Sequence, residues 1–157
     1  DPDYFVSGEM QNPQRMMRAL EVKLSSGKSI TTFQSNKKKK RDFNIIKFGL
    51  ELPRDILYER INKRVEDMID MGLIEEAKEL IPCKNLNALQ TVGYRELFEY
   101  FDGKISRDRA IELIKQNTRH YAKRQMTWFK RDSSISWLDM QDPENAQQII
   151  IEQAASE

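Results

Sequence analysis

Basic and aromatic side chains alternate over residues 118–131. At helical spacing, Arg119 and Lys123 fall near one side of this stretch, while Tyr121 and Trp128 belong to an apolar and aromatic stripe beside them. Cations of this kind can contact the phosphates of a nucleic acid. The pattern is equally typical of a solvent-facing helix whose aromatic residues pack in the core, and for an arbitrary helix that interpretation is favoured. The rest of the chain must decide between the two.

Two more groups of polar residues could contact phosphate. Gln14, Arg15 and Arg18 lie at the start of a predicted helix, where free backbone N–H groups also favour anions. An ordinary solvated first turn explains them equally well. Arg60 and Arg64 lie one turn apart on another predicted helix, where they can clamp a phosphate or pair with neighbouring carboxylates. Ion pairing is the favoured interpretation from the local sequence.

Metal and disulfide chemistry have little support. The chain has one cysteine, Cys83, and one histidine, His120, which form neither an internal disulfide nor a metal ligand set of the usual spacing. We therefore expect a reducing compartment, the cytoplasm. There is no apolar run of membrane-spanning length and no signal peptide. The chain lacks an initiator Met, which suggests a fragment or a processed product.

Charge is segregated along the 157 residues. The net charge is only +1 although 32% of the residues are charged. Five consecutive cations run from Lys37 to Arg41, whereas residues 51–79 carry much of the acid. The cationic run cannot form a core, and it is expected to be a mobile loop, a localisation-like tract or an arm that touches nucleic acid.

The elements that would position these residues are mostly helices. Asn12-Pro13 and Gly27 bound one helix, and Ser106 caps the long helix that carries residues 118–131. The other predicted helices span residues 53–71, 73–81, 94–101 and 144–155. One strand is predicted over residues 43–52, and because a lone strand leaves its backbone groups unpaired, a weaker candidate at 134–138 is its possible partner.

Apolar residues on these helices predict a core. On the first helix they form more than one stripe, so much of it is expected to be buried, including Met16 and Met17. Val92, Met126 and Trp128 are likewise expected in the core, and Tyr121 and Phe129 are expected to fix the long helix to it. On the helix of residues 53–71, the expected buried side is formed by Ile56, Leu57, Ile61, Val65, Met68 and Ile69.

The order of these pieces resembles the tRNA dimethylallyltransferases, also called tRNA isopentenyltransferases. Four ordered motifs, spread over nearly all of the chain, carry the resemblance. They are Asn-Pro-Gln-Arg with Arg-Ala-Leu-Glu-Val at residues 12–22, Leu-Tyr-Glu-Arg-Ile-Asn-Lys-Arg-Val at 57–65, Gln-Thr-Val-Gly-Tyr-Arg-Glu-Leu at 90–97, and Thr-Arg with Ala-Lys-Arg-Gln and Thr-Trp at 118–128.

The resemblance implies a transferase that moves a dimethylallyl group from dimethylallyl diphosphate to N6 of the adenosine 3′ of the anticodon, assisted by Mg²⁺. It also implies that the protein is a monomer, that it binds the tRNA anticodon stem-loop, and that it does not bind a membrane. The family's fold is a P-loop α/β core with a helical insertion. Residues 1–42 correspond to the end of that insertion, and residues 43–157 to the carboxy-terminal part of the core.

The resemblance also assigns residue roles. Arg64 matches the arginine that reaches the diphosphate, where a planar cation stabilises the charge on the leaving group. Arg60 and Arg119 receive no assignment. The positions that match the family's tRNA-contacting segments are Gln14, Arg15, Arg18, Gln90, Thr91, Gly93, Tyr94, Arg95, Lys123, Arg124, Gln125, Thr127, Trp128 and Lys130.

One departure from the family pattern is large. No Gly-x-x-x-x-Gly-Lys-Ser/Thr motif occurs in the 157 residues, and the aspartate that accepts the N6 proton belongs to the same missing portion. No catalytic residue and no metal ligand are therefore assigned to this chain, and the chain alone is expected to be inactive. The alternatives are a non-catalytic, basic, helical RNA-binding module and a helical protein-interaction domain.

Overall fold

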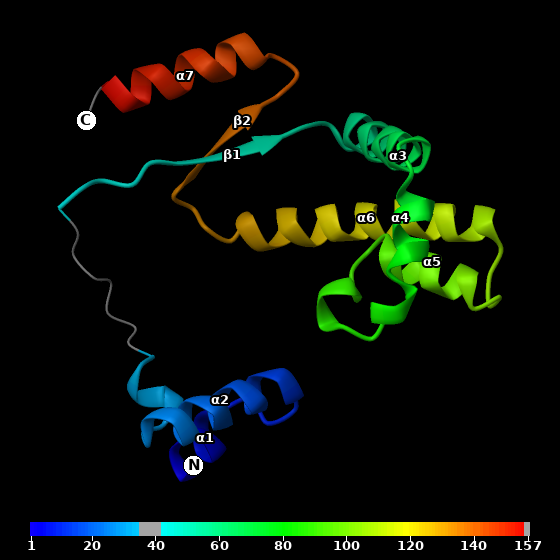
Figure 1. The fold of residues 1–157 in the computed structure, drawn as a ribbon. Coiled ribbons are helices and arrows are strands. Elements are labelled where there is room, and N and C mark those ends of the chain that lie inside the picture. Colours follow the sequence, from blue (N-terminus) through cyan, green and yellow to red (C-terminus); the bar gives the residue numbers. More distant parts are fainter. Residues whose placement is uncertain (35–41, 156–157) are drawn as a thin grey trace. The chain divides into compact units, whose positions relative to one another are not determined.

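The computed structural model describes residues 1–34 and 42–155, which form two compact units, Asp1–Phe43 and Asn44–Glu157. Within these described residues the chain folds into seven α-helices, three short 3₁₀ turns and two strands (Figure 1). The prediction of a mainly helical chain is confirmed. The cationic run from Lys37 to Arg41 lies outside the described residues.

The first unit contains helices α1 (Pro2–Ser7) and α2 (Pro13–Ser26) and a 3₁₀ turn at Ile30–Thr32. Both helices begin in the same way. A side-chain oxygen of Asp1 accepts the backbone N–H of Tyr4 at 3.1 Å, a side-chain oxygen of Asn12 accepts that of Arg15 at 3.2 Å, and a proline follows each cap. Gly27 ends α2 in the left-handed region, with φ of 71°. The predicted bounds of α2 are confirmed, whereas α1 was not predicted although Asp1-Pro2 is the same signal.

The expectation that much of α2 is buried is wrong. Ala19 is its one buried residue, and Met17, Leu20 and Leu24 are 61, 55 and 86% exposed. The unit has only three short elements, of which the 3₁₀ turn packs against both helices. So few elements can cover only part of the circumference of a 14-residue helix.

Four helices build the core of the second unit. They are α3 (Arg54–Asp70), α4 (Leu73–Glu79), α5 (Tyr94–Phe101) and α6 (Arg107–Phe129). Ile61 and Val65 are buried on the predicted side of α3, and the other four predicted positions are half-buried. The helix predicted over 73–81 ends earlier, at Glu79, and 3₁₀ turns at Ile81–Cys83 and Asn87–Leu89 lead to α5. The buried cluster consists of Val65, Leu73, Ala77, Leu97, Ala110 and Ile114.

Two parallel strands, β1 (Lys47–Glu51) and β2 (Ile135–Asp139), precede and follow these four helices in the sequence, and the last element, α7 (Pro143–Ala155), comes after β2. The second strand is confirmed, and β1 is shorter than the predicted 43–52. Gly49 lies opposite Trp137, and a Cβ at Gly49 would come within 2.7 Å of the indole ring. The absence of a side chain at Gly49 therefore lets the indole pack across β1.

A surface ion pair supports the start of this sheet. Lys47 Nζ donates to Asp132 Oδ2 at 2.7 Å, and Asp132 also accepts from the hydroxyl and the backbone N–H of Ser134. The hydrogen bond from Lys47, and then those from Ser134, hold the pKa of Asp132 well below its usual range. The turn before β2 is thus tied to β1 through a carboxylate that stays ionised.

Candidate functional site

A cavity of about 660 Å³ lies at the carboxyl ends of the two parallel strands, between α3 and α6. Leu52 and Met140, which directly follow β1 and β2, line it together with Tyr58 and Arg60 of α3 and Gln125 of α6. Ligands of α/β proteins bind preferentially outside the carboxyl ends of parallel strands. The position of the cavity therefore makes it the leading candidate for a binding site.

The cavity is bordered by cations from both helices. Arg54 and Arg60 come from α3, Lys123 comes from α6, and Lys130 directly follows α6. Lys130 Nζ lies 2.9 Å from a carboxylate oxygen of Glu51 and 5.4 Å from the centre of the Trp137 ring. Such a concentration of positive charge favours an anionic ligand.

Arg119, which the sequence left without a role, joins α6 to α3. Its Nη1 donates to Asn62 Oδ1 at 2.6 Å, and its guanidinium lies 5.9 Å from the centre of the Tyr58 ring. Arg54 Nε donates to the hydroxyl of Tyr58 at 2.9 Å. Tyr58 is therefore held by cations from two helices where it borders the cavity.

Ion pairing, which the local sequence favours for Arg60 and Arg64 and which stayed the favoured role of Arg60, is not what the structure shows. Neither guanidinium forms a hydrogen bond or an ion pair with another residue in the described part of the chain, and Glu66, one of the nearby carboxylates, is bonded to Lys115 of α6 at 2.8 Å. Both arginines are exposed and lie one turn apart on α3. Arg60 lines the cavity, whereas Arg64 is not among its lining residues.

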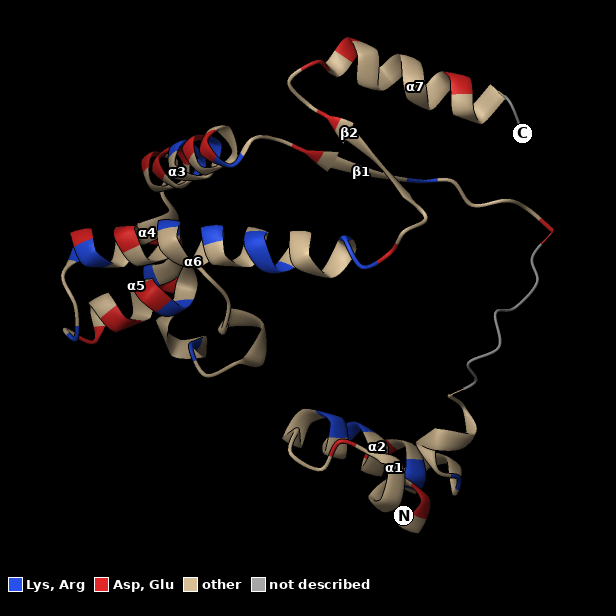
Figure 2. Cartoon of the chain, turned by 180° about the vertical axis from the view of Figure 1, so that it is seen from behind, with Lys and Arg blue, Asp and Glu red and all other residues tan. Residues whose placement is uncertain are grey.

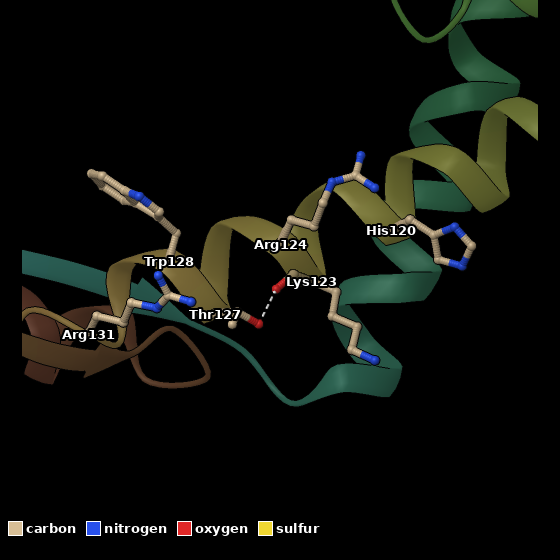
Figure 3. A pocket seen from close by; sticks show the side chains of 6 residues that line it. All are labelled: His120, Lys123, Arg124, Thr127, Trp128 and Arg131. Carbon is tan, nitrogen blue, oxygen red and sulfur yellow. Dashed lines mark hydrogen bonds between the residues drawn. The ribbon is translucent and has the colours of Figure 1, made fainter. Parts of the chain in front are cut away.

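The outward side of α6 carries a second, shallower hollow of about 470 Å³, lined by six residues of the helix and its end. Figure 3 shows the side chains of Arg124, Trp128 and Arg131 extending away from the helix axis. Lys123 and Thr127 border both this hollow and the cavity. The basic stretch is thus divided between two sides of α6, and Figure 2 shows Lys and Arg positions at several places along this helix.

The aromatic residues of this stretch do not lie in the core, and that expectation is wrong. Tyr121, Trp128 and Phe129 are 53, 66 and 43% exposed, while Met126 is half-buried. The end of α6 continues past α4 and α5 (Figure 1), so these helices do not cover it. Exposed aromatic rings beside cations are a pattern typical of surfaces that stack nucleic-acid bases.

The third predicted segment, residues 90–95, precedes and begins α5. Gln90 Nε2 donates to the carbonyl oxygen of Lys84 at 2.6 Å, and the carbonyl of Thr91 accepts from the backbone of Arg95 at 3.2 Å. Tyr94 donates its hydroxyl to Glu76 at 2.5 Å, and this bond to a carboxylate raises the pKa of Tyr94. The Arg95 guanidinium and the Gln90 and Thr91 side chains are exposed, and Val92 is half-buried as expected.

In the first unit, Gln14, Arg15 and Arg18 lie exposed in the first turns of α2. Arg15 pairs with Glu9, and Arg18 pairs with Glu21 at 3.1 Å. Ion pairs this exposed contribute little free energy, so both guanidiniums can exchange their partners for a phosphate.

Neither a metal site nor a membrane span is found in residues 1–34 and 42–155. They contain no group of three or more His, Cys, Asp or Glu side chains that could hold a metal ion. No helix among them is long and apolar enough to cross a membrane.

Comparison with known proteins finds a family model and relatives that all belong to one enzyme family. Residues 1–132 match the family model described as IPP transferase. The chain is 51% identical over 142 residues to a tRNA dimethylallyltransferase of Christiangramia forsetii, covering 90% of this chain and 47% of that protein.

The chain is also similar to solved structures of transferases that act on tRNA. A tRNA delta(2)-isopentenylpyrophosphate transferase of Staphylococcus epidermidis is similar at 32% identity and a TM-score of 0.68, over 94% of this chain and 50% of that one. A eukaryotic dimethylallyltransferase acting on tRNA is similar at 26% identity and a TM-score of 0.66, over 96% and 42%. The chain spans about half the length of the curated relatives that it matches.

Proposed function

The chain belongs to the IPP transferase family, and from this premise we propose that the complete protein modifies tRNA by prenyl transfer. The group transferred is dimethylallyl, the donor is dimethylallyl diphosphate, and the acceptor is N6 of the adenosine 3′ of the anticodon. The observation that carries the proposal is the cationic cavity at the carboxyl ends of β1 and β2, which is continuous with the basic end of α6 through Lys123 and Thr127.

The role of this chain on the donor side is electrostatic. As the bond between the dimethylallyl carbon and the diphosphate oxygen breaks, negative charge builds on the diphosphate. Guanidinium groups that are not already paired can take up that charge without first breaking a bond within the protein. Arg64 has this role by its family motif, and the position of Arg60 on the cavity makes it a second candidate.

On the acceptor side, α6 holds the RNA. A base must leave its stack to react, and it is then read by hydrogen bonds to its edges and held by contacts to its neighbours. Gln125 borders the cavity and can supply edge hydrogen bonds, whereas Arg124 and the exposed Trp128 on the outward side can contact flanking phosphates and bases. Residues 90–95 and the start of α2 supply further RNA contacts in this proposal.

In this proposal, three components of the reaction come from outside this chain. The proton acceptor for N6 and the diphosphate loop belong to the rest of the protein, and so do any ligands of Mg²⁺, which supplies charge neutralisation of the diphosphate when bound. The 157-residue chain alone therefore shows no turnover.

A transfer assay tests the proposal. The complete protein is incubated with dimethylallyl diphosphate labelled in the prenyl group and with an anticodon stem-loop carrying adenosine 3′ of the anticodon. We expect label in the RNA, and none when guanosine replaces that adenosine. Equal labelling of the two RNAs, or no labelling of either, would count against the proposal.

A non-catalytic RNA-binding module is the second candidate, and the exposed cations of α6 favour it. This function predicts binding of structured RNA with a steep salt dependence and little preference for the anticodon loop. Binding of the complete protein to the stem-loop and to an unrelated hairpin, at several salt concentrations, separates the two candidates.

A further inference from the structure

Glu96 is the one charged side chain that is buried among the described residues, with 2% of its surface exposed. It lies in the first turn of α5, directly after the segment of residues 90–95. None of the roles above uses it. A buried carboxylate is costly unless its oxygens are hydrogen-bonded, so its partners indicate what it does.

The two carboxylate oxygens of Glu96 hold two different parts of the protein. Oε2 accepts the backbone N–H of Gly93 at 2.8 Å. Oε1 accepts the side-chain amide of Asn117 on α6 at 2.7 Å and lies 3.4 Å from Nη2 of Arg95. One side chain thus joins residues 90–95 to α6, and these are two of the segments proposed to contact RNA.

Packing alone does not require this carboxylate. The core residues Leu97, Ala110 and Ile114 are apolar, so an apolar side chain could fill this space, but it would leave the N–H of Gly93 and the amide of Asn117 without their acceptor. An apolar side chain cannot, however, fix the backbone N–H of Gly93. Gly93 has φ of 107° and ψ of −63°, a conformation that residues with a Cβ rarely adopt, and the carboxylate of Glu96 holds its N–H in that conformation.

The other end of the link is rigid. Asn117 and Lys123 belong to the same continuous helix, six residues apart, which corresponds to about 9 Å along its axis. A displacement of residues 90–95 relative to Asn117 is therefore a displacement relative to the RNA-contacting end of α6. Figure 1 shows α5 and the loop before it alongside α6.

We propose that Glu96 is a positioning residue for RNA recognition, which sets the distance and orientation of residues 90–95 relative to the RNA-contacting end of α6. This inference rests on the proposed function. Glu96 acts through Gly93 and Asn117 and does not itself touch the RNA.

The test uses the complete enzyme with Glu96→Leu, which keeps the volume and removes both acceptors. We expect KM for the anticodon stem-loop to rise about tenfold, the effect of losing one charge-assisted hydrogen bond, and KM for dimethylallyl diphosphate to stay within about twofold. Glu96→Gln should restore most of the affinity, since its amide oxygen can still accept from Gly93. Glu99→Leu, on the same helix, is the matched control and should behave like the wild type.

Asn117→Ala keeps the test valid if Glu96→Leu does not fold, because it removes the α6 end of the link and leaves the bond to Gly93. It should raise KM for the RNA and leave KM for the diphosphate unchanged. Unchanged RNA affinity in these variants, or equal increases in both KM values with a lowered Tm, would overturn the inference by showing a merely structural role. If the wild type transfers no prenyl group, the proposed function fails, and direct binding of the stem-loop still decides the role of Glu96.

Discussion

Replacing Arg64 with alanine in the complete enzyme should lower turnover and leave the fold unchanged. The guanidinium is exposed and has no hydrogen bond or ion pair within the described residues, so the free energy of unfolding should change by less than about 0.5 kcal/mol. Loss of one donor to the charge that develops in the transition state costs about 2–4 kcal/mol, or about 30- to 1000-fold in kcat.

Steady-state kinetics with each substrate varied in turn measure this effect. We expect a large fall in kcat and a weaker interaction with dimethylallyl diphosphate, with little change in KM for the RNA. Lys63→Ala is the matched control, because Lys63 is an exposed cation next to Arg64 without an ion pair in the described part of the chain. Wild-type kinetics for Arg64→Ala would refute the assignment. If Arg60→Ala alone then showed the loss, the role would pass to the arginine that lines the cavity.

Three further predictions concern stability and RNA affinity. Trp128→Ala should weaken stem-loop binding by about 1–3 kcal/mol, which is the contribution of one stacked base. Its Tm should be unchanged, because the side chain is 66% exposed. An affinity equal to that of the wild type would exclude stacking on this ring. Gly49→Ala should lower the free energy of unfolding by about 1–3 kcal/mol in denaturant titrations, since its Cβ would meet the Trp137 ring, and an unchanged midpoint would contradict the packing of β1 on β2. Asp132→Asn should destabilise the protein at neutral pH, because the lowered pKa of Asp132 means that folding favours its ionised form, bonded to Lys47. That stability is present above the unfolded pKa of about 3.9 and is lost as the pH falls further, so the two proteins should converge in acid; a constant difference in Tm at all pH values would contradict this.

The bounds of many helices could be predicted because their signals are local. Asn12-Pro13 and Gly27 delimit α2, and Ser106 caps α6. Each signal depends on a side chain or a backbone conformation within a few residues of the helix end. The parallel partner of β1 was a weaker prediction, since its pairing joins residues far apart in the sequence.

Exposure could not be predicted from the same patterns. Periodicity shows which residues share a face of a helix, but not whether another element covers that face. Met17 on α2 and Trp128 on α6 therefore looked like core residues and are exposed. The exposure of Trp128 changes the interpretation of α6, because an uncovered ring beside Arg124 is available to a ligand.

The partners of the charged residues could not be predicted either. Glu66 is bonded to Lys115, which lies 49 residues away, and Arg60 and Arg64 form no ion pair within the described residues. Glu96 was not a predicted site residue, because the residue three positions before it is Gly93, which lacks the side-chain oxygen of the usual capping pattern. The spacing of Gly93 and Glu96 was the available signal, and the bond to Asn117 could come only from the structure.

The most direct test of the central claim is nucleoside analysis of an anticodon stem-loop after incubation with the complete protein and dimethylallyl diphosphate. Digestion followed by mass spectrometry should find one dimethylallyl group on N6 of the adenosine 3′ of the anticodon and none elsewhere in the RNA. An unmodified RNA, or a prenyl group on another nucleotide, would contradict the function proposed for this family member.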